Sequence, residues 1–108
     1  MVKFRKRVEF AISMLGLISE ADGEIVSVKA MTKVIPRSYQ VRIAKSLLKA
    51  KIIKAKEGRN GGYTLARDAK DITLKDISEA IDGKNDFKNK LMNKVSGEID
   101  QVLGQYTI

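Results

Sequence analysis

The only proline of this 108-residue chain, Pro36, interrupts a stretch that otherwise has a helical pattern. Proline lacks a backbone N–H and its ring clashes with the preceding turn, so a regular helix does not continue through it. The run Val34-Ile35-Pro36 therefore predicts a tight turn between a short helix, which begins after Ser27 as its N-cap, and a longer helix over about 37–50. Two helices joined in this way form a helix-turn-helix.

A glycine-rich cluster, 57–62, follows this helix pair and separates two short β-prone segments, 52–56 and 63–66. Turn-forming residues between two such segments predict a two-stranded hairpin, here with Arg59 at its tip. Glycines let the backbone approach a ligand closely, and an arginine can enter a narrow minor groove of DNA. A hairpin in this position is the wing of a winged-helix domain.

Two further amphipathic helices are predicted, one on each side of this unit. The first has about five turns and ends near Gly23, and the other begins at Thr73, forms a capping box with Asp76 and closes at Gly83. Spacings of three and four residues define the apolar stripe of the first helix, which comprises Phe4, Val8, Ala11, Leu15 and Ile18.

A last helix, over about 87–106, carries an apolar seam with a/d spacing. Such a seam serves either as part of the intramolecular core or as an interface. Because the central unit already has a core of its own, we expect the seam to pair with a second copy of the chain. The predicted dimerisation residues are Met92, Val95, Ile99, Val102 and Tyr106.

The predicted fold class is therefore mainly α with a small β-hairpin. It comprises a winged helix-turn-helix domain over residues 1–83 and a C-terminal dimerisation helix over 84–108, together forming one compact unit. A chain of this length can bury a sufficient core without disulfides or a structural metal.

The net charge of +8 is concentrated in the middle of the chain. Residues 29–67 hold eleven basic residues and one acid, Glu57, which gives +10, while the remainder carries −2. A concentrated basic field attracts a polyanion, and nucleic acid is the commonest one. A solvated surface that only aids solubility is the alternative.

The predicted helix over 37–50 shows how this charge is presented. Its inner side is formed by Ile43, Ala44, Leu47 and Leu48, and the opposite side by Ser38, Arg42, Lys45 and Lys49. Arg42 and Gln40 are the candidates to read bases, and Lys45, Lys49 and Lys54 are the candidates to contact phosphates. The full set of predicted DNA-binding residues is Arg37, Ser38, Tyr39, Gln40, Arg42, Lys45, Lys49, Lys54, Arg59 and Asn60.

The residue types that are missing exclude several functions. Without His or Cys, the chain cannot form zinc fingers, Cys-ligated iron–sulfur clusters or thiolate nucleophiles, so we expect no metal, cofactor or catalytic residue. A zero cysteine count fits a cytoplasmic protein.

The basic start of the chain resembles a signal peptide in outline, but Glu9 and the helical spacing of the apolar residues oppose this interpretation. No segment reaches the ~20 apolar residues of a membrane span. The acids at 68, 71, 76 and 79 are scattered rather than paired for catalysis.

Three motifs follow one another in the order expected for a particular family. They are Ile35-Pro36-Arg37-Ser38-Tyr39, Gly58-Arg59-Asn60-Gly61-Gly62-Tyr63-Thr64-Leu65-Ala66-Arg67 and Ile72-Thr73-Leu74-Lys75-Asp76-Ile77. In this order they resemble the Rrf2 family of bacterial winged-helix transcription regulators, which includes IscR, NsrR and CymR. The resemblance covers essentially the whole chain, and the wing followed by the last motif is its most specific part.

The resemblance implies a homodimer, formed through the long last helix with a contribution from the first helix, on a palindromic site. The recognition helix would enter the major groove and the wing the flanking minor groove. Ser38 and Tyr39 match the Ser-Tyr pair near the start of the family's recognition helix, and two base-contacting positions of one member fall on Val41 and Arg42.

The sequence departs from the family pattern at two places. The customary wing arginine is replaced by Glu57, and an arginine stands two positions later, at Arg59. Cluster-binding members carry three cysteines before the dimerisation helix, whereas this chain has none. The iron–sulfur function is therefore not implied for this chain.

The leading hypothesis is a sequence-specific DNA-binding transcriptional regulator, a repressor, that acts as a homodimer. One alternative is a winged-helix protein that binds nucleic acid without sequence preference. Another is a winged helix that uses the C-terminal seam to bind a different protein. No residue pattern identifies a small-molecule effector.

Overall fold

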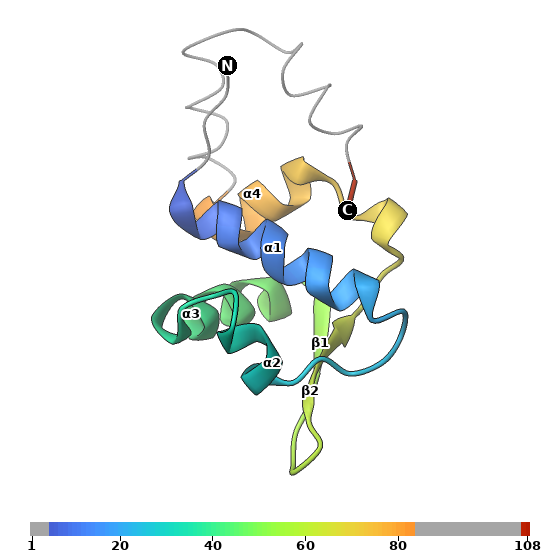
Figure 1. Cartoon of the computed structure of the whole chain (residues 1–108). Helices are drawn as coiled ribbons and strands as arrows, with labels where there is room; N and C mark the ends of the chain where they lie inside the picture. The colour runs from blue at the N-terminus through green and yellow to red at the C-terminus, as the bar shows by residue number, and fades with distance from the viewer. Residues whose placement is uncertain (1–4, 84–106) are drawn as a thin grey trace, which may run out of the picture.

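The computed structural model describes residues 5–83 and 107–108. The elements follow in the order α1 (Lys6–Glu20), α2 (Val28–Thr32), α3 (Arg37–Lys49), β1 (Ile53–Lys56), β2 (Gly62–Leu65), the 3-10 turn η1 (Ala69–Asp71) and α4 (Leu74–Asp82). Helices α1, α3 and α4 all contact one another, and the hairpin extends away from the helices (Figure 1). The mainly α fold with a small hairpin, predicted from sequence, is confirmed.

The core forms where α1, α3 and α4 meet the base of the hairpin. Helix α1 buries Val8, Ala11, Leu15 and Ile18, as its spacing predicts, and Met14 in addition, while Phe4 of the predicted stripe lies outside the described residues. The remaining fully or nearly fully buried apolar residues come from the other elements and the segments between them, and are Met31, Ile35, Ile43, Ala44, Leu47, Ile52, Ile53, Ile72 and Ile77.

The helix boundaries follow the local capping signals. Ser27 caps α2 by accepting a hydrogen bond on Oγ from the Ala30 amide at 3.1 Å, and Pro36 is the N-cap residue of α3. In the capping box of α4, Thr73 Oγ1 accepts from the Asp76 amide and Asp76 Oδ2 accepts from the Thr73 amide, each at 3.0 Å. These caps are local in sequence, which is why the sequence predicted them.

The hairpin pairs β1 with β2 in antiparallel register, from Ile53 opposite Leu65 to Lys56 opposite Gly62. A third backbone segment extends it, because the amides of Val26 and Tyr63 each donate to the other's carbonyl at 3.0 and 2.9 Å. A Cβ atom at Gly62 would lie 2.2 Å from the Val26 carbonyl oxygen. Glycine is therefore required where this segment crosses the hairpin.

The C-terminal predictions fall mostly outside the described residues. Met92, Val95, Ile99, Val102 and Tyr106 lie there, so the dimerisation helix and the division at residue 84 stay predictions. The described end of the chain returns to the core, where the Ile108 amide donates to the Ile72 carbonyl at 3.0 Å. Within the described residues, no helix has the length and apolar character to cross a membrane.

Candidate nucleic-acid interface

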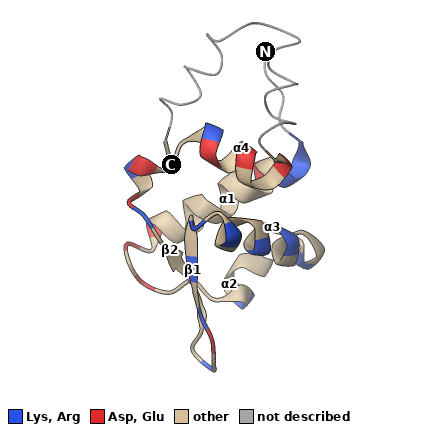
Figure 2. Cartoon of the chain, turned by 180° about the vertical axis from the view of Figure 1, so that it is seen from behind, with Lys and Arg blue, Asp and Glu red and all other residues tan. Residues whose placement is uncertain are grey.

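Helix α3 presents an exposed cationic face, defined as Ser38, Arg42, Lys45 and Lys49. All four side chains are exposed, and they lie opposite the buried residues of the helix. The helix contains no acidic residue, and Figure 2 shows basic positions on α3 while acidic positions appear on α4. The predicted grouping of these four residues on one face is confirmed.

Gln40 does not belong to this surface. Its side chain is 3% exposed, and its Nε2 donates to Thr32 Oγ1 at 3.0 Å and to the Ile35 carbonyl at 3.2 Å. Both protons of the amide nitrogen are therefore used inside the helix-turn-helix. The expectation that Gln40 reads a base is wrong for this fold, because the residue ties α3 to the end of α2 and to the turn.

Besides Tyr39, two large apolar residues of α3 are exposed. Leu48, predicted to face the core, is 36% exposed. It lies at the flank of the helix, where no neighbouring element covers it fully. Val41 is 63% exposed, the largest value among the exposed large apolar residues of the described chain. An exposed apolar side chain on a recognition helix can contact the methyl group of thymine.

The predicted contacts at the start of α3 and on the wing are exposed. Arg37 and Tyr39 lie in the first turn of α3, and the Tyr39 ring packs at 4.8 Å between centroids against Phe10 of α1. Arg59 and Asn60 are exposed at the end of the hairpin. Gly58, with φ of 105°, provides the left-handed turn there, a conformation that favours glycine.

Lys54 is separated from the cationic face of α3. It lines a different depression, together with Asp22, Glu24 and Asp68, near the C-terminal end of α1. Asp71 and Arg67 line the same depression, so acids outnumber cations in it and it is less suited to a phosphate than the α3 face. The structure thus does not bring Lys54 together with the other predicted phosphate contacts.

A groove between the first turn of α1 and helix α3 continues the cationic face; we call it the α1–α3 groove. It has a volume of about 1200 Å³, and Tyr39, Ile43 and Ile81 contribute its apolar and aromatic lining. No acid of the described residues lines it. Its cations are Arg5, Lys6, Arg7, Arg42, Lys45 and Lys49.

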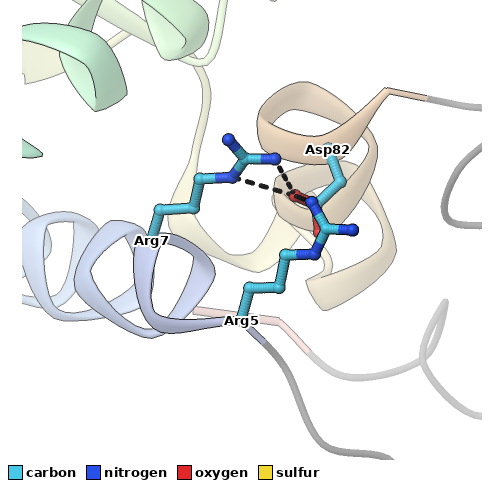
Figure 3. Close-up of polar contacts among 3 residues, drawn as sticks. All are labelled: Arg5, Arg7 and Asp82. Carbon is cyan, nitrogen blue, oxygen red and sulfur yellow. Dashed lines mark hydrogen bonds and ion pairs between the residues drawn. The ribbon is translucent and has the colours of Figure 1, made fainter.

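A buried carboxylate holds one wall of this groove in place. The Asp82 side chain is 4% exposed, and its Oδ1 accepts hydrogen bonds from Nε and Nη2 of Arg7 at 3.1 and 3.0 Å (Figure 3). Arg5 Nη1 lies 3.8 Å from the same oxygen. The contacts fix the first turn of α1 against the end of α4.

Sequence reasoning missed the contribution of α1 to this surface. The sequence signal for it is the basic run at the start of the chain, which also has the outline of a signal peptide. The groove brings Lys6 together with Lys45 and Lys49, about forty positions further along the chain, and only tertiary packing creates that proximity.

A family model matches residues 4–108, and its description is Rrf2, iron-dependent transcriptional regulator. The chain belongs to the Rrf2 family. A similar relative is the HTH-type transcriptional regulator Rv1287 of Mycobacterium tuberculosis, 31% identical over 85 residues, which cover 76% of this chain and 53% of the relative. The chain thus spans about half the length of that protein. The HTH-type transcriptional regulator YwgB of Bacillus subtilis is 29% identical, with 94% of this chain and 69% of the relative covered.

Solved structures of regulators share the fold. CymR, the global cysteine regulator of B. subtilis, superposes with a TM-score of 0.81 at 20% identity, covering 99% of this chain and 93% of CymR. IscR of T. potens gives a TM-score of 0.78 at 24% identity, covering 98% and 82%. The resemblance to a winged-helix transcription regulator, inferred from sequence motifs, is confirmed at the level of family and fold.

The residues present do not fit the iron that the family description implies. The chain has no His and no Cys, and the described residues contain no group of three or more His, Cys, Asp or Glu that could hold a metal ion. This chain therefore cannot ligate an iron–sulfur cluster through cysteine or bind iron through an imidazole group.

Proposed function

We propose that this chain is a sequence-specific DNA-binding transcriptional repressor. The observation that carries the proposal is the exposed, acid-free face of α3, with Arg42, Lys45 and Lys49 pointing away from the core beside a wing that presents Arg59. A helix with this face fits the major groove of DNA, and an arginine on the wing fits the flanking minor groove. The proposed repressor acts in the cytoplasm, without catalysis and without a cofactor.

The side chains divide between two roles. Arg42 has a guanidinium group that can pair in a bidentate way with O6 and N7 of guanine, so it is the proposed base-reading residue. Lys45 and Lys49 contact phosphates, which position the protein without selecting a sequence. Ser38 and Arg37 lie in the first turn of α3, and the N-terminal residues of a recognition helix are the ones that contact base edges.

The proposed active form is a homodimer on a palindromic operator. The predicted C-terminal seam supports this, since a terminal apolar stripe needs a partner surface. Two copies related by a two-fold axis would place their α3 helices about one helical turn of DNA, or a multiple of it, apart. Sedimentation of the pure protein tests this step, and a stable monomer that binds single half-sites would contradict it.

The main experiment is a salt titration of binding to a specific duplex, selected from random or genomic fragments, and to a scrambled duplex. Lys49→Ala should lower the salt slope by about one and weaken both duplexes alike. Arg42→Ala should weaken the specific duplex by about 1–3 kcal/mol more than the scrambled one. If Arg42→Ala weakens both duplexes equally, its role as the base-reading residue is wrong.

A second function is favoured by one observation. Once Gln40 is buried, the cationic face of α3 keeps a single side chain, Arg42, that can pair in a bidentate way with a base. A helix with one such residue also fits a protein that binds nucleic acid without sequence preference. Equal affinity of the wild-type protein for unrelated duplexes would establish this alternative.

A further inference from the structure

The α1–α3 groove has cations on both of its walls. Arg42, Lys45 and Lys49 project from α3, while Lys6 and its neighbours come from the first turn of α1. Cations that face one another across a groove repel, and an anion between them relieves that repulsion. The groove is therefore best suited to a ligand with negative charges distributed along its length.

The positions of Arg5 and Arg7 are set by Asp82. Arg7 donates two hydrogen bonds to one buried carboxylate oxygen, so the first turn of α1 is held against the last residue of α4. Asp82 compensates one positive charge on the α1 wall, and no acid of the described residues lines the groove itself. The groove stays strongly positive, and its walls are fixed before any ligand binds, which lowers the entropic cost of binding.

We propose that the α1–α3 groove holds the sugar–phosphate backbone of one DNA strand, and that Lys6 contacts a phosphate from the side opposite α3. This inference rests on the proposed function, because it requires α3 to face the duplex. Arg42 lines the groove and also belongs to the exposed face of α3, so a duplex on that face reaches the groove. The apolar and aromatic surface that Ile81 and the exposed Tyr39 contribute to the lining suits the deoxyribose rings between successive phosphates.

The decisive variant is Lys6→Ala, because Lys6 is exposed and alanine is favourable within a helix. The matched control is Lys70→Ala, which removes the same charge from an exposed lysine that lines neither this groove nor the depression around Lys54. Both variants lower the net charge equally, so a difference between them reports the groove itself. Thermal unfolding of each variant should match the wild-type protein.

Binding is measured by fluorescence anisotropy of a labelled duplex between about 50 and 200 mM salt. Lys6→Ala should lower the salt slope by about one and weaken specific and scrambled duplexes alike, by roughly five- to tenfold near 0.1 M salt. Lys70→Ala should leave the slope at its wild-type value. If Lys6→Ala and Lys70→Ala give the same slope and affinity, the proposed strand contact is overturned.

A second measurement separates a DNA strand from a small anion. Inorganic tripolyphosphate is titrated into the DNA-free protein at constant ionic strength, with binding followed by calorimetry. Tight tripolyphosphate binding that Lys6→Ala abolishes, together with unchanged DNA binding by that variant, would overturn the proposal in favour of a small-anion site. Weaker DNA binding by Lys6→Ala, together with no tight tripolyphosphate binding by the wild-type protein, supports the proposal that the groove holds a DNA strand.

The failure of this inference differs from the failure of the proposed function. A wild-type protein that binds no duplex, or an Arg42→Ala variant that binds as the wild type does, contradicts the function itself. If Arg42→Ala weakens DNA binding while Lys6→Ala binds DNA as Lys70→Ala does, the groove proposal is wrong and the proposed function still stands.

Discussion

The two sides of helix α3 differ in composition, exposure and role. One side, comprising Gln40, Ile43, Ala44 and Leu47, is buried against the core, whereas the other presents the exposed cationic face. Burial of apolar groups stabilises the fold by about 25 cal/mol per Å², whereas exposed cations contribute little to stability. The helix therefore separates folding from binding, and substitutions on its two sides should change different measured quantities.

The largest expected effect is that of Leu47→Ala on the buried side. Leu47 is fully buried in the core, so its truncation should lower the free energy of unfolding by about 2–5 kcal/mol, through lost burial and the cavity left behind. Urea denaturation followed by circular dichroism measures this. A loss below about 1 kcal/mol would mean that the core around α3 is not packed as described.

A smaller loss of unfolding free energy is expected for Gln40→Ala than for Leu47→Ala. The substitution leaves the Ile35 carbonyl and Thr32 hydroxyl without the amide donor and should cost about 1–3 kcal/mol of unfolding free energy. Ser38→Ala, on the exposed side, is the control and should stay within about 0.5 kcal/mol of wild type. If Gln40→Ala were as stable as the control but bound the specific duplex more weakly, Gln40 would contact DNA after all.

Leu48→Ala sharpens the boundary between the two sides. Because Leu48 is partly exposed, we expect a loss of about 0.5–1 kcal/mol, well below that of Leu47→Ala. The same urea experiment measures it. Equal losses for the two leucines would restore the expectation from the sequence that both face the core.

The smallest effect on stability belongs to Lys45→Ala. Lys45 is exposed among other cations, so its removal should change the unfolding free energy by no more than about 0.5 kcal/mol. The same variant should lower the salt slope of DNA binding by about one. A stability loss above 1 kcal/mol would contradict the assignment of the cationic face to binding alone.

Much of the fold could be predicted because its signals are local. Pro36, the Ser27 cap, the capping box at Thr73 and the glycine-rich turn each act within a few residues, and the structure contains all four features. The isolated β-bridge between Val26 and Tyr63 could not be predicted, because it depends on pairing between residues that are far apart along the chain.

The candidate site was predicted only in part, for a related reason. Helical periodicity gave the direction of Ser38, Arg42, Lys45 and Lys49 correctly, since these positions lie directly opposite the core. Leu48 and Tyr39 lie at the flanks of the helix, where exposure depends on which neighbouring element is present. The Tyr39 ring packs against Phe10 of α1 and is still 36% exposed, the same value as Leu48.

Backbone chemistry and short-range spacing specify the helix-turn-helix, the wing and the basic middle segment, so these features could be predicted from the residues alone. Three other features depend on tertiary packing: Gln40 joins α2 to α3, Lys54 lines a depression rich in acids, and the basic start of α1 forms a wall opposite α3. The Arg7–Asp82 contact, 75 positions apart in sequence, illustrates the reason. Contacts across such distances depend on how complete elements pack, and neither composition nor periodicity encodes that packing.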